Sequence, residues 1–157
     1  QKILFQVLGL CRARNIHIYV VTGPGYTGYH SLRKKVDRME DVTLTHATGV
    51  ISRIMEKVSL AITSNGRTVY EMAHMNIPAI VIPQHDREKT HDFACEENGF
   101  VALEPYEKGV TEQVVLEQLT RILDDQDYRR FLYDNTQKFL FHKNKTGVLK
   151  LIIDLLN

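Results

Sequence analysis

The sequence contains no tryptophan, only two cysteines and no excess of charge of one sign. It has 20 lysines and arginines against 19 aspartates and glutamates, so the formal net charge is +1. Because this balance creates no strong field for polyanions, we expect neither nucleic acid nor an anionic membrane as a partner. The longest apolar runs, such as Ile77–Ile82, are far shorter than the ~20 residues of a membrane-spanning helix. We therefore expect a cytoplasmic protein.

The cysteines and histidines give no support for metal chemistry. Cys11 and Cys95 lie outside any CxxC or Cys/His ligand spacing, and the seven histidines are scattered. We predict two buried free thiols. The sequence predicts no metal site and no resident cofactor.

The length of 157 residues, 43% of them hydrophobic, is typical of one globular domain. Short β-branched runs alternate with helical stripes. The pattern predicts strands over 16–21, 42–45, 60–63, 77–82 and 100–103, and helices over 3–11, 32–39, about 50–58, about 67–75, a segment ending near Gly99, and the chain from Thr111 on. Strands that alternate with helices form a parallel sheet with helices on both faces. We therefore predict a single Rossmann-like α/β domain over residues 1–157.

The beginning of the sequence has an unusual pattern. It starts at Gln1 inside a helical stripe that no strand precedes. In an α/β fold a preceding strand would end in a loop at the ligand site. We expect the sequence to be a C-terminal fragment of a longer chain, with the first strand missing.

A glycine-rich turn, Gly23–Gly28, matches the GxGxxG pattern between a predicted strand and a helix. A dinucleotide-binding fingerprint also needs an acid at the carboxyl end of the next strand. Here that strand ends at His46, and Asp41 lies at its beginning. Pro24 also removes one backbone N–H group. We favour a simple turn, and an NAD-type dinucleotide-binding domain stays an alternative.

A second motif, TSNGRTVYE over Thr63–Glu71, lies where a predicted strand turns into a helix. A polar residue after the strand can cap the helix, Gly66 lets a ligand approach the backbone, and free N–H groups can bind an anion such as a diphosphate. The carboxylate of Glu71 can accept two ribose hydroxyls. From the motif alone, an i, i+4 ion pair between Arg67 and Glu71 is an equally good interpretation.

The stretch Ser64–Pro83, SNGRTVYEMAHMNIPAIVIP, resembles the nucleotide-binding signature in the C-terminal domain of GT-B-type nucleotide-sugar enzymes. It is similar to the UDP-sugar hydrolase of pseudaminic acid synthesis and its spore-coat polysaccharide homologues. The similarity is strongest over 48–93 and, in element order, extends over 1–105. NGRTVYE followed by RExTH also resembles the C-terminal half of proteins that fuse a sialic-acid-type cytidylyltransferase to such a domain.

The resemblance implies a set of site residues. The small-residue turn would bind the diphosphate, a helix glutamate would hold the ribose, and the loop before the neighbouring helix would hold the base through backbone groups. The segment after Pro83 lacks the family's Asn-Gln or Gln-Gln pair. Its polar residues could contact a phosphate or sugar, or simply solvate a helix start. The residues are Ser64, Asn65, Gly66, Arg67 and Thr68 for the diphosphate, Glu71 for the ribose, His46, Ala47, Thr48 and Gly49 for the base, and Lys89, Thr90 and His91 for the sugar or phosphate.

The function implied by the resemblance is the nucleotide-sugar-binding half of a hydrolase or glycosyltransferase-like enzyme in surface-glycan or nonulosonic acid synthesis. The ligand would be a nucleoside diphosphate or nucleotide sugar, and the partner would be an N-terminal catalytic domain of the same polypeptide. No catalytic residue is identified, so we expect the chain alone to be inactive. A non-catalytic regulatory module is a further alternative, which Lys89 and Thr90 in place of the family's pair favour.

Overall fold

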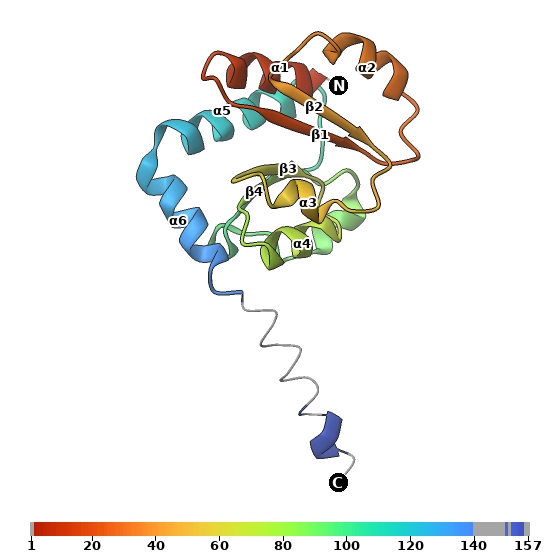
Figure 1. Ribbon diagram of the computed structural model, residues 1–157. Coiled ribbons are helices and arrows are strands. Elements are labelled where there is room, and N and C mark those ends of the chain that lie inside the picture. The colour runs from red at the N-terminus through yellow and green to blue at the C-terminus, as the bar shows by residue number, and fades with distance from the viewer. Residues whose placement is uncertain (1, 140–149, 151, 156–157) are drawn as a thin grey trace. The chain divides into compact units, whose positions relative to one another are not determined.

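The computed structural model describes residues 2–139, 150 and 152–155. The chain divides into two compact units, which are described in turn: residues 1–58 with 107–117, and residues 59–106 with 118–157. Helices alternate with strands along the chain (Figure 1). Within the described ranges every strand pair is parallel. The predicted α/β class, with Rossmann-like parallel strands flanked by helices, is confirmed, but the described strands form two sheets instead of the single sheet expected.

The first unit holds a two-stranded sheet. Strand β1 (Ile18–Thr22) pairs with β2 (Val42–His46) in a register that places Thr22 opposite His46. The helices that belong to this unit are α1 (Lys2–Arg12), α2 (Tyr29–Val36) and α3 (Ser52–Met55). The end of each strand therefore lies directly beside the end of the other.

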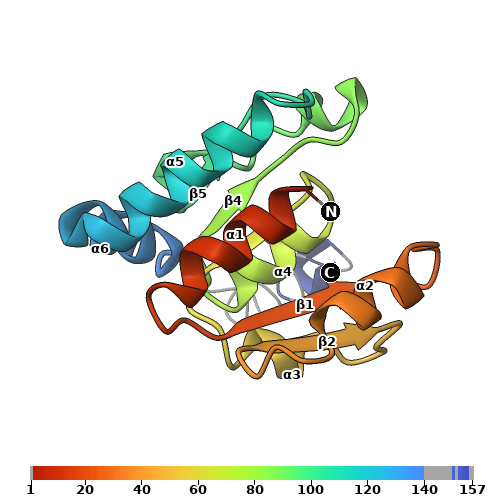
Figure 2. The ribbon, with the colours of Figure 1, turned by 90° about the horizontal axis from the view of Figure 1, so that it is seen from above.

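Helices α1 and α2 pack against one face of this sheet (Figure 2). The buried core consists of Leu8 from α1 with Leu32 and Val36 from α2. Because alternate residues of a strand share a face, one set of strand side chains meets this core. That set comprises Ile18, Val20, Val42 and Leu44. The apolar stripes expected from the sequence thus supply both layers.

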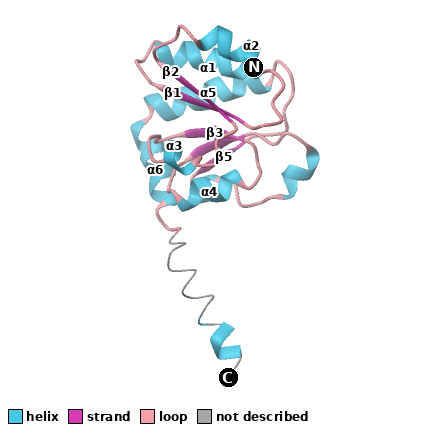
Figure 3. Cartoon of the chain, turned by 45° about the vertical axis from the view of Figure 1, so that its right-hand side comes forward, coloured by secondary structure: helices cyan, strands magenta, loops and turns pink. Residues whose placement is uncertain are grey.

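The second unit holds a three-stranded sheet with β4 in the centre. Figure 3 draws the strands in magenta and labels β3 and β5. Its strands are β3 (Ala61–Thr63), β4 (Ala79–Val81) and β5 (Phe100–Ala102). Every residue of Ile77–Ile82 is buried, as expected for an apolar run in a central parallel strand, and Pro78 lies just outside the strand. Among the described strands, only β4 pairs along both of its edges.

Along the chain, helical segments of the second unit lie between its strands and after the last of them. They are α4 (Thr68–His74), the 3-10 turns η1 (Asp86–Thr90) and η2 (Glu96–Asn98), and α6 (Gln126–Thr136). Helix α5 (Thr111–Asp124) belongs in part to each unit.

Three helical segments end in the same way before the next strand. Asn15, Asn76 and Gly99 adopt positive φ values of 55°, 57° and 87° after α1, α4 and η2. In each case the following N–H group bonds back to the carbonyl five residues earlier, as Phe100 does to Cys95 at 2.9 Å. This is the Schellman arrangement, which reverses the chain into a strand. Because it occupies Asn15 and Ile16, β1 begins two residues later than predicted.

Three of the expected helices differ clearly from the structure. The segment predicted to end near Gly99 forms η1 and η2 instead of one α-helix, because it has no continuous apolar stripe, although Gly99 is its left-handed cap as predicted. Helix α3 has four residues, since turn bonds such as Lys57 N–H to Ile54 O replace helical ones. The helix expected from Thr111 on breaks at Asp125 into α5 and α6, and its part over 140–149 lies outside the described residues.

Candidate functional site

The carboxyl ends of β3, β4 and β5 form one edge of the second unit's sheet, where ligands of parallel α/β folds bind. The loop after β3 leads through Gly66 into α4. The segment after β4 contains η1, and the segment after β5 begins at Leu103. The predicted diphosphate and sugar or phosphate residues therefore share this edge.

Asn65 connects two of these segments. Its side chain is buried, and its Nδ2 donates to the carbonyls of Glu88 at 2.8 Å and His91 at 3.2 Å. The Nδ1 of His91 donates in turn to the carbonyl of Asn65 at 2.9 Å. The loop after β3 and the segment after β4 are therefore one cross-linked element. The side-chain amide of Asn65 is used within the protein, and no side chain caps α4, contrary to the expectation from the motif.

The loop between β3 and α4 leaves backbone donors unused. The N–H groups of Gly66, Arg67 and Thr68 bond to no acceptor among the residues that the structure describes, whereas Val69 N–H returns to Gly66 O at 3.2 Å. A Cβ built on Gly66 would meet only Ser64 Oγ, at 3.8 Å. Three adjacent donors, one of them on a residue without a side chain, are thus unused within the described part of the chain.

Arg67 and Glu71 are both exposed. Over the described residues they form no ion pair with each other, so the i, i+4 interpretation of the motif is wrong. Next to Glu71, the ring of Tyr70 lies 4.7 Å from that of Phe93. The cation and the carboxylate of the motif are therefore both accessible to a ligand.

The segment over η1 contains the predicted sugar or phosphate residues. The Oγ1 of Thr90 donates to Arg87 O at 2.9 Å, so this hydroxyl closes the turn. The Nζ of Lys89 lies 2.8 Å from Glu104 Oε2, and this hydrogen bond and the glutamate charge raise the pKa of Lys89. Glu104, which follows β5, was not among the predicted residues.

The predicted base loop, His46 to Gly49, lies in the first unit at the carboxyl end of β2. The Nδ1 of His46 is 2.9 Å from Thr22 Oγ1, and the Tyr29 ring stacks on the imidazole at 4.3 Å with 21° between the planes. Ala47 has φ 49° and donates to Thr22 O at 2.9 Å, while Thr48 Oγ1 accepts from Val50 N–H. The contributions of Thr22 and Tyr29 were missed, although Thr22 directly follows the strand predicted over 16–21.

The glycine-rich turn after β1 does not require its glycines. Neither Gly23 nor Gly25 has a positive φ, and a Cβ at either position would meet nothing within 4 Å. Tyr26 N–H closes the turn on Gly23 O at 3.1 Å. A dinucleotide fingerprint uses glycine for tight turning and close contact, so these features favour a simple turn.

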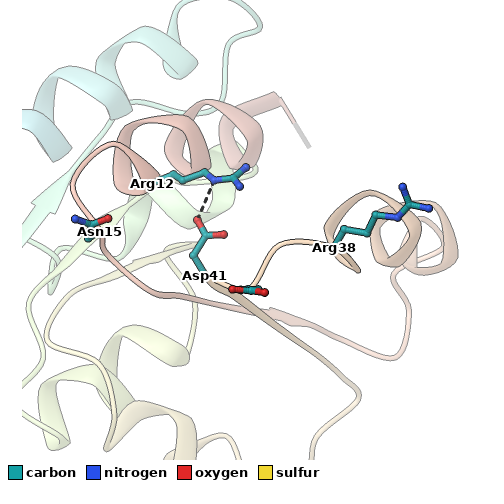
Figure 4. A pocket seen from close by; sticks show the side chains of 5 residues that line it. Arg12, Asn15, Arg38 and Asp41 are labelled. Carbon is teal, nitrogen blue, oxygen red and sulfur yellow. Dashed lines mark ion pairs between the residues drawn. The ribbon is translucent and has the colours of Figure 1, made fainter.

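A separate pocket of about 420 Å³ lies at the amino ends of β1 and β2 (Figure 4). Its lining is charged, and Arg12 Nε lies 3.7 Å from Asp41 Oδ2, a buried oxygen without a hydrogen-bond partner. Its lining residues are Arg12, Asn15, Arg38, Glu40 and Asp41. None of the predicted site residues lies in it.

Neither a metal site nor a membrane span is found in the part of the chain that the structure describes. No group of three or more potential ligands is positioned to bind a metal, and no helix there has the length and apolarity to cross a membrane. Both cysteines are free; Cys11 is buried, as predicted, and Cys95 is only half-buried because η2 leaves it near the surface.

No protein-family model matches this chain, and no curated protein or solved structure is significantly similar to it.

Proposed function

We propose that this chain is the nucleotide-binding half of a nucleotide-sugar hydrolase or glycosyltransferase-like enzyme. The observation that carries the proposal is the row of unused N–H donors at Gly66, Arg67 and Thr68, at the carboxyl end of β3. Phosphate oxygens are the usual partners of such backbone donors. The ligand is a nucleoside diphosphate or a nucleotide sugar.

Each element of the edge has a role in this proposal. The loop amides bind the diphosphate, Arg67 and Lys89 add positive charge, and Glu71 accepts the ribose hydroxyls. The resemblance assigns base binding to the loop from His46 to Gly49, which belongs to the first unit. In the reaction, water or an acceptor hydroxyl attacks the anomeric carbon, and the bond to the diphosphate oxygen breaks. Cationic groups then stabilise the negative charge on the departing diphosphate.

The attacking group and its catalytic base belong to an N-terminal catalytic domain of the same polypeptide. The activity would serve surface-glycan or nonulosonic acid synthesis in the cytoplasm, in some polypeptides fused to a cytidylyltransferase. The chain alone is inactive, because positioning from both sides of the site contributes ~7–11 kcal/mol to catalysis. Its affinity for the nucleotide is weak, with a Kd on the order of 1 mM.

Calorimetric titration with UDP, CDP, CMP and NAD tests this proposal. UDP or CDP should bind, and Gly66→Ala should weaken binding about tenfold by placing a methyl group beside the loop donors. Gly25→Ala is the matched control, because both glycines have room for a Cβ. Binding of NAD that Gly25→Ala abolishes would favour the dinucleotide alternative, and no binding at all would favour the regulatory module.

A further inference from the structure

The ion pair between Lys89 and Glu104 joins the segments that follow two neighbouring strands. Lys89 lies in η1, after β4, and Glu104 lies two residues after β5. The Lys89 Nζ and the Glu104 Oε2 are 2.8 Å apart, with 49% and 87% of the two side chains exposed. Both groups are therefore accessible to an ion from solvent.

The backbone on each side of this pair is held in place. Leu103 N–H donates to Val81 O at 2.9 Å, and Tyr106 N–H donates to Pro83 O at 3.0 Å, so Glu104 lies between two bonds to the end of β4. On the other side, the Asn65 amide holds the carbonyl of Glu88, directly before Lys89. Hydrogen bonds within the protein thus restrain both backbone segments that carry the two charges.

A carboxylate that pairs with the Lys89 ammonium group resembles a phosphate that binds the same group. Both groups are anions that accept a charge-assisted hydrogen bond from the ammonium group. Through Asn65, η1 is also cross-linked to the loop with the unused donors at Gly66, Arg67 and Thr68. A phosphate that binds Lys89 therefore competes with the Glu104 carboxylate, which is also negatively charged.

We propose that Glu104 is an internal competitor of the bound phosphate for Lys89. In the free protein its carboxylate holds the ammonium group, and the ligand displaces it. When the diphosphate product dissociates, the Glu104 carboxylate pairs with Lys89 again and so promotes product release. Product release limits the turnover of many enzymes. Glu104 acts through Lys89 and touches no reacting atom. This inference rests on the proposed function, in which Lys89 binds phosphate.

The pair is weak enough to be displaced. Exposed ion pairs contribute little to stability, and salt screens them. Glu104→Gln should therefore strengthen anion binding by roughly two- to fivefold, the range that exposed charge pairs span, mainly through slower dissociation. The gain should shrink as the salt concentration rises.

The test measures inorganic pyrophosphate and UDP binding to the full chain by calorimetry, with dissociation rates from NMR line shapes. Glu104→Gln is compared with Asp127→Asn, which also removes one negative charge but at a different position. Asp127 lies beside Tyr128, whose hydroxyl donates to Glu96 at 2.5 Å at the amino end of β5, so it is remote from this edge. The expected result is tighter binding for Glu104→Gln alone.

A double-mutant cycle with Lys89→Met separates competition from a structural effect. In the Lys89→Met background, Glu104→Gln should no longer change affinity. Unchanged affinity in the single variant, or an equal gain in Asp127→Asn, would overturn the inference while UDP binding still supports the proposed function. If pyrophosphate shows the expected pattern across the cycle but UDP does not bind, the competition between Glu104 and phosphate stands and the nucleotide-binding function is overturned. No binding of either anion to any variant overturns both.

Discussion

At the end of the β1–β2 sheet, one side chain is held by two others, whereas at the end of the β3–β4–β5 sheet two backbone segments are held by one buried amide. In the first unit, the imidazole of His46 is fixed by the Thr22 hydroxyl and the Tyr29 ring. In the second unit, Asn65 holds the carbonyls of Glu88 and His91.

The difference has a consequence for ligand binding. Side-chain contacts in the first unit restrain the residue that would meet the ligand. The amide in the second unit restrains only backbone, which leaves the exposed side chains of Arg67 and Glu71 and the loop donors for a ligand. We propose that the second arrangement is the better candidate for a preorganised anion site, because hydrogen bonds within the protein hold the loop that carries its donors.

The largest expected effect comes from Gly99→Ala, which tests how tightly the second unit is built. Its Cβ would lie 2.4 Å from Thr136 Cγ2 and 2.6 Å from Leu132 O, at a φ of 87°. We expect a loss of about 3–5 kcal/mol in the free energy of unfolding, from backbone strain and overpacking together. Urea denaturation followed by circular dichroism measures this loss.

Gly109→Ala in the first unit is its matched control. Gly109 has a φ of 90°, but a Cβ there would meet nothing within 4 Å. Only the strain remains, so a loss of about 1 kcal/mol is expected. Equal losses in the two variants would show that packing around Gly99 contributes nothing.

Asn65→Asp tests the amide link directly. The carboxylate has the same shape but donates no hydrogen bond, and it places a charge at a buried position next to two carbonyls. We expect a loss of about 2–4 kcal/mol in unfolding free energy, faster amide hydrogen exchange over Asp86–Thr90, and weaker anion binding. Urea denaturation measures the first change, hydrogen exchange the second, and calorimetry with pyrophosphate the third.

Asn135→Asp provides the comparison for Asn65→Asp. The amide of Asn135 makes one hydrogen bond, to Glu96 O at 3.0 Å, and its side chain is half-buried. A loss of about 1 kcal/mol is expected, with exchange over Asp86–Thr90 unchanged. If both variants accelerated that exchange equally, Asn65 would not be the specific link.

Glu71→Ala should weaken nucleoside diphosphate binding by roughly tenfold or more, because hydrogen bonds to a charged acceptor contribute about 1.5–3 kcal/mol. Calorimetry with UDP and with pyrophosphate measures the change. The effect should be confined to UDP, since pyrophosphate has no ribose. Unchanged UDP affinity would remove Glu71 from the site.

The smallest effect is expected for Thr22→Val, which tests the first unit. Thr22 is buried and its hydroxyl bonds to His46, so the variant should lose about 1 kcal/mol. Thr43→Val removes the equivalent bond to His17 Nε2, 2.8 Å long, at the exposed opposite end of the same sheet. That control should change stability by less than about 0.5 kcal/mol. Urea denaturation compares the two, and equal losses would contradict the role of burial.

Much of the fold was predictable from local pattern. The strand over Ile77–Ile82 was recognisable by its continuous apolar character, and Gly99 by the glycine before Phe100. Asn15 and Asn76 carry the same signal, an asparagine followed by isoleucine, which explains the later start of β1. Such features depend on neighbours within about six residues, the span of a Schellman motif.

The candidate site was predictable only as separate segments. The resemblance pointed to Ser64–Glu71 and Lys89–His91, but nothing local shows that the Asn65 amide joins them across 23 and 26 residues. The absence of an Arg67–Glu71 ion pair was not predictable from the sequence either, because i, i+4 spacing permits a contact without requiring it. Glu104 and Tyr29 escaped notice because each acts on a residue far along the chain.

The sequence by itself determined the alternation of strands and helices, the apolar faces and the left-handed helix ends, because these follow from periodicity and from the conformational range of each residue. Only the tertiary structure decided which polar groups are used within the protein and which are left for a ligand. A hydrogen bond forms when two groups come within about 3 Å in the correct direction. For Asn65 with η1, Lys89 with Glu104, and Thr22 with His46, the pairing of parallel strands brings those groups together at the ends of the sheets.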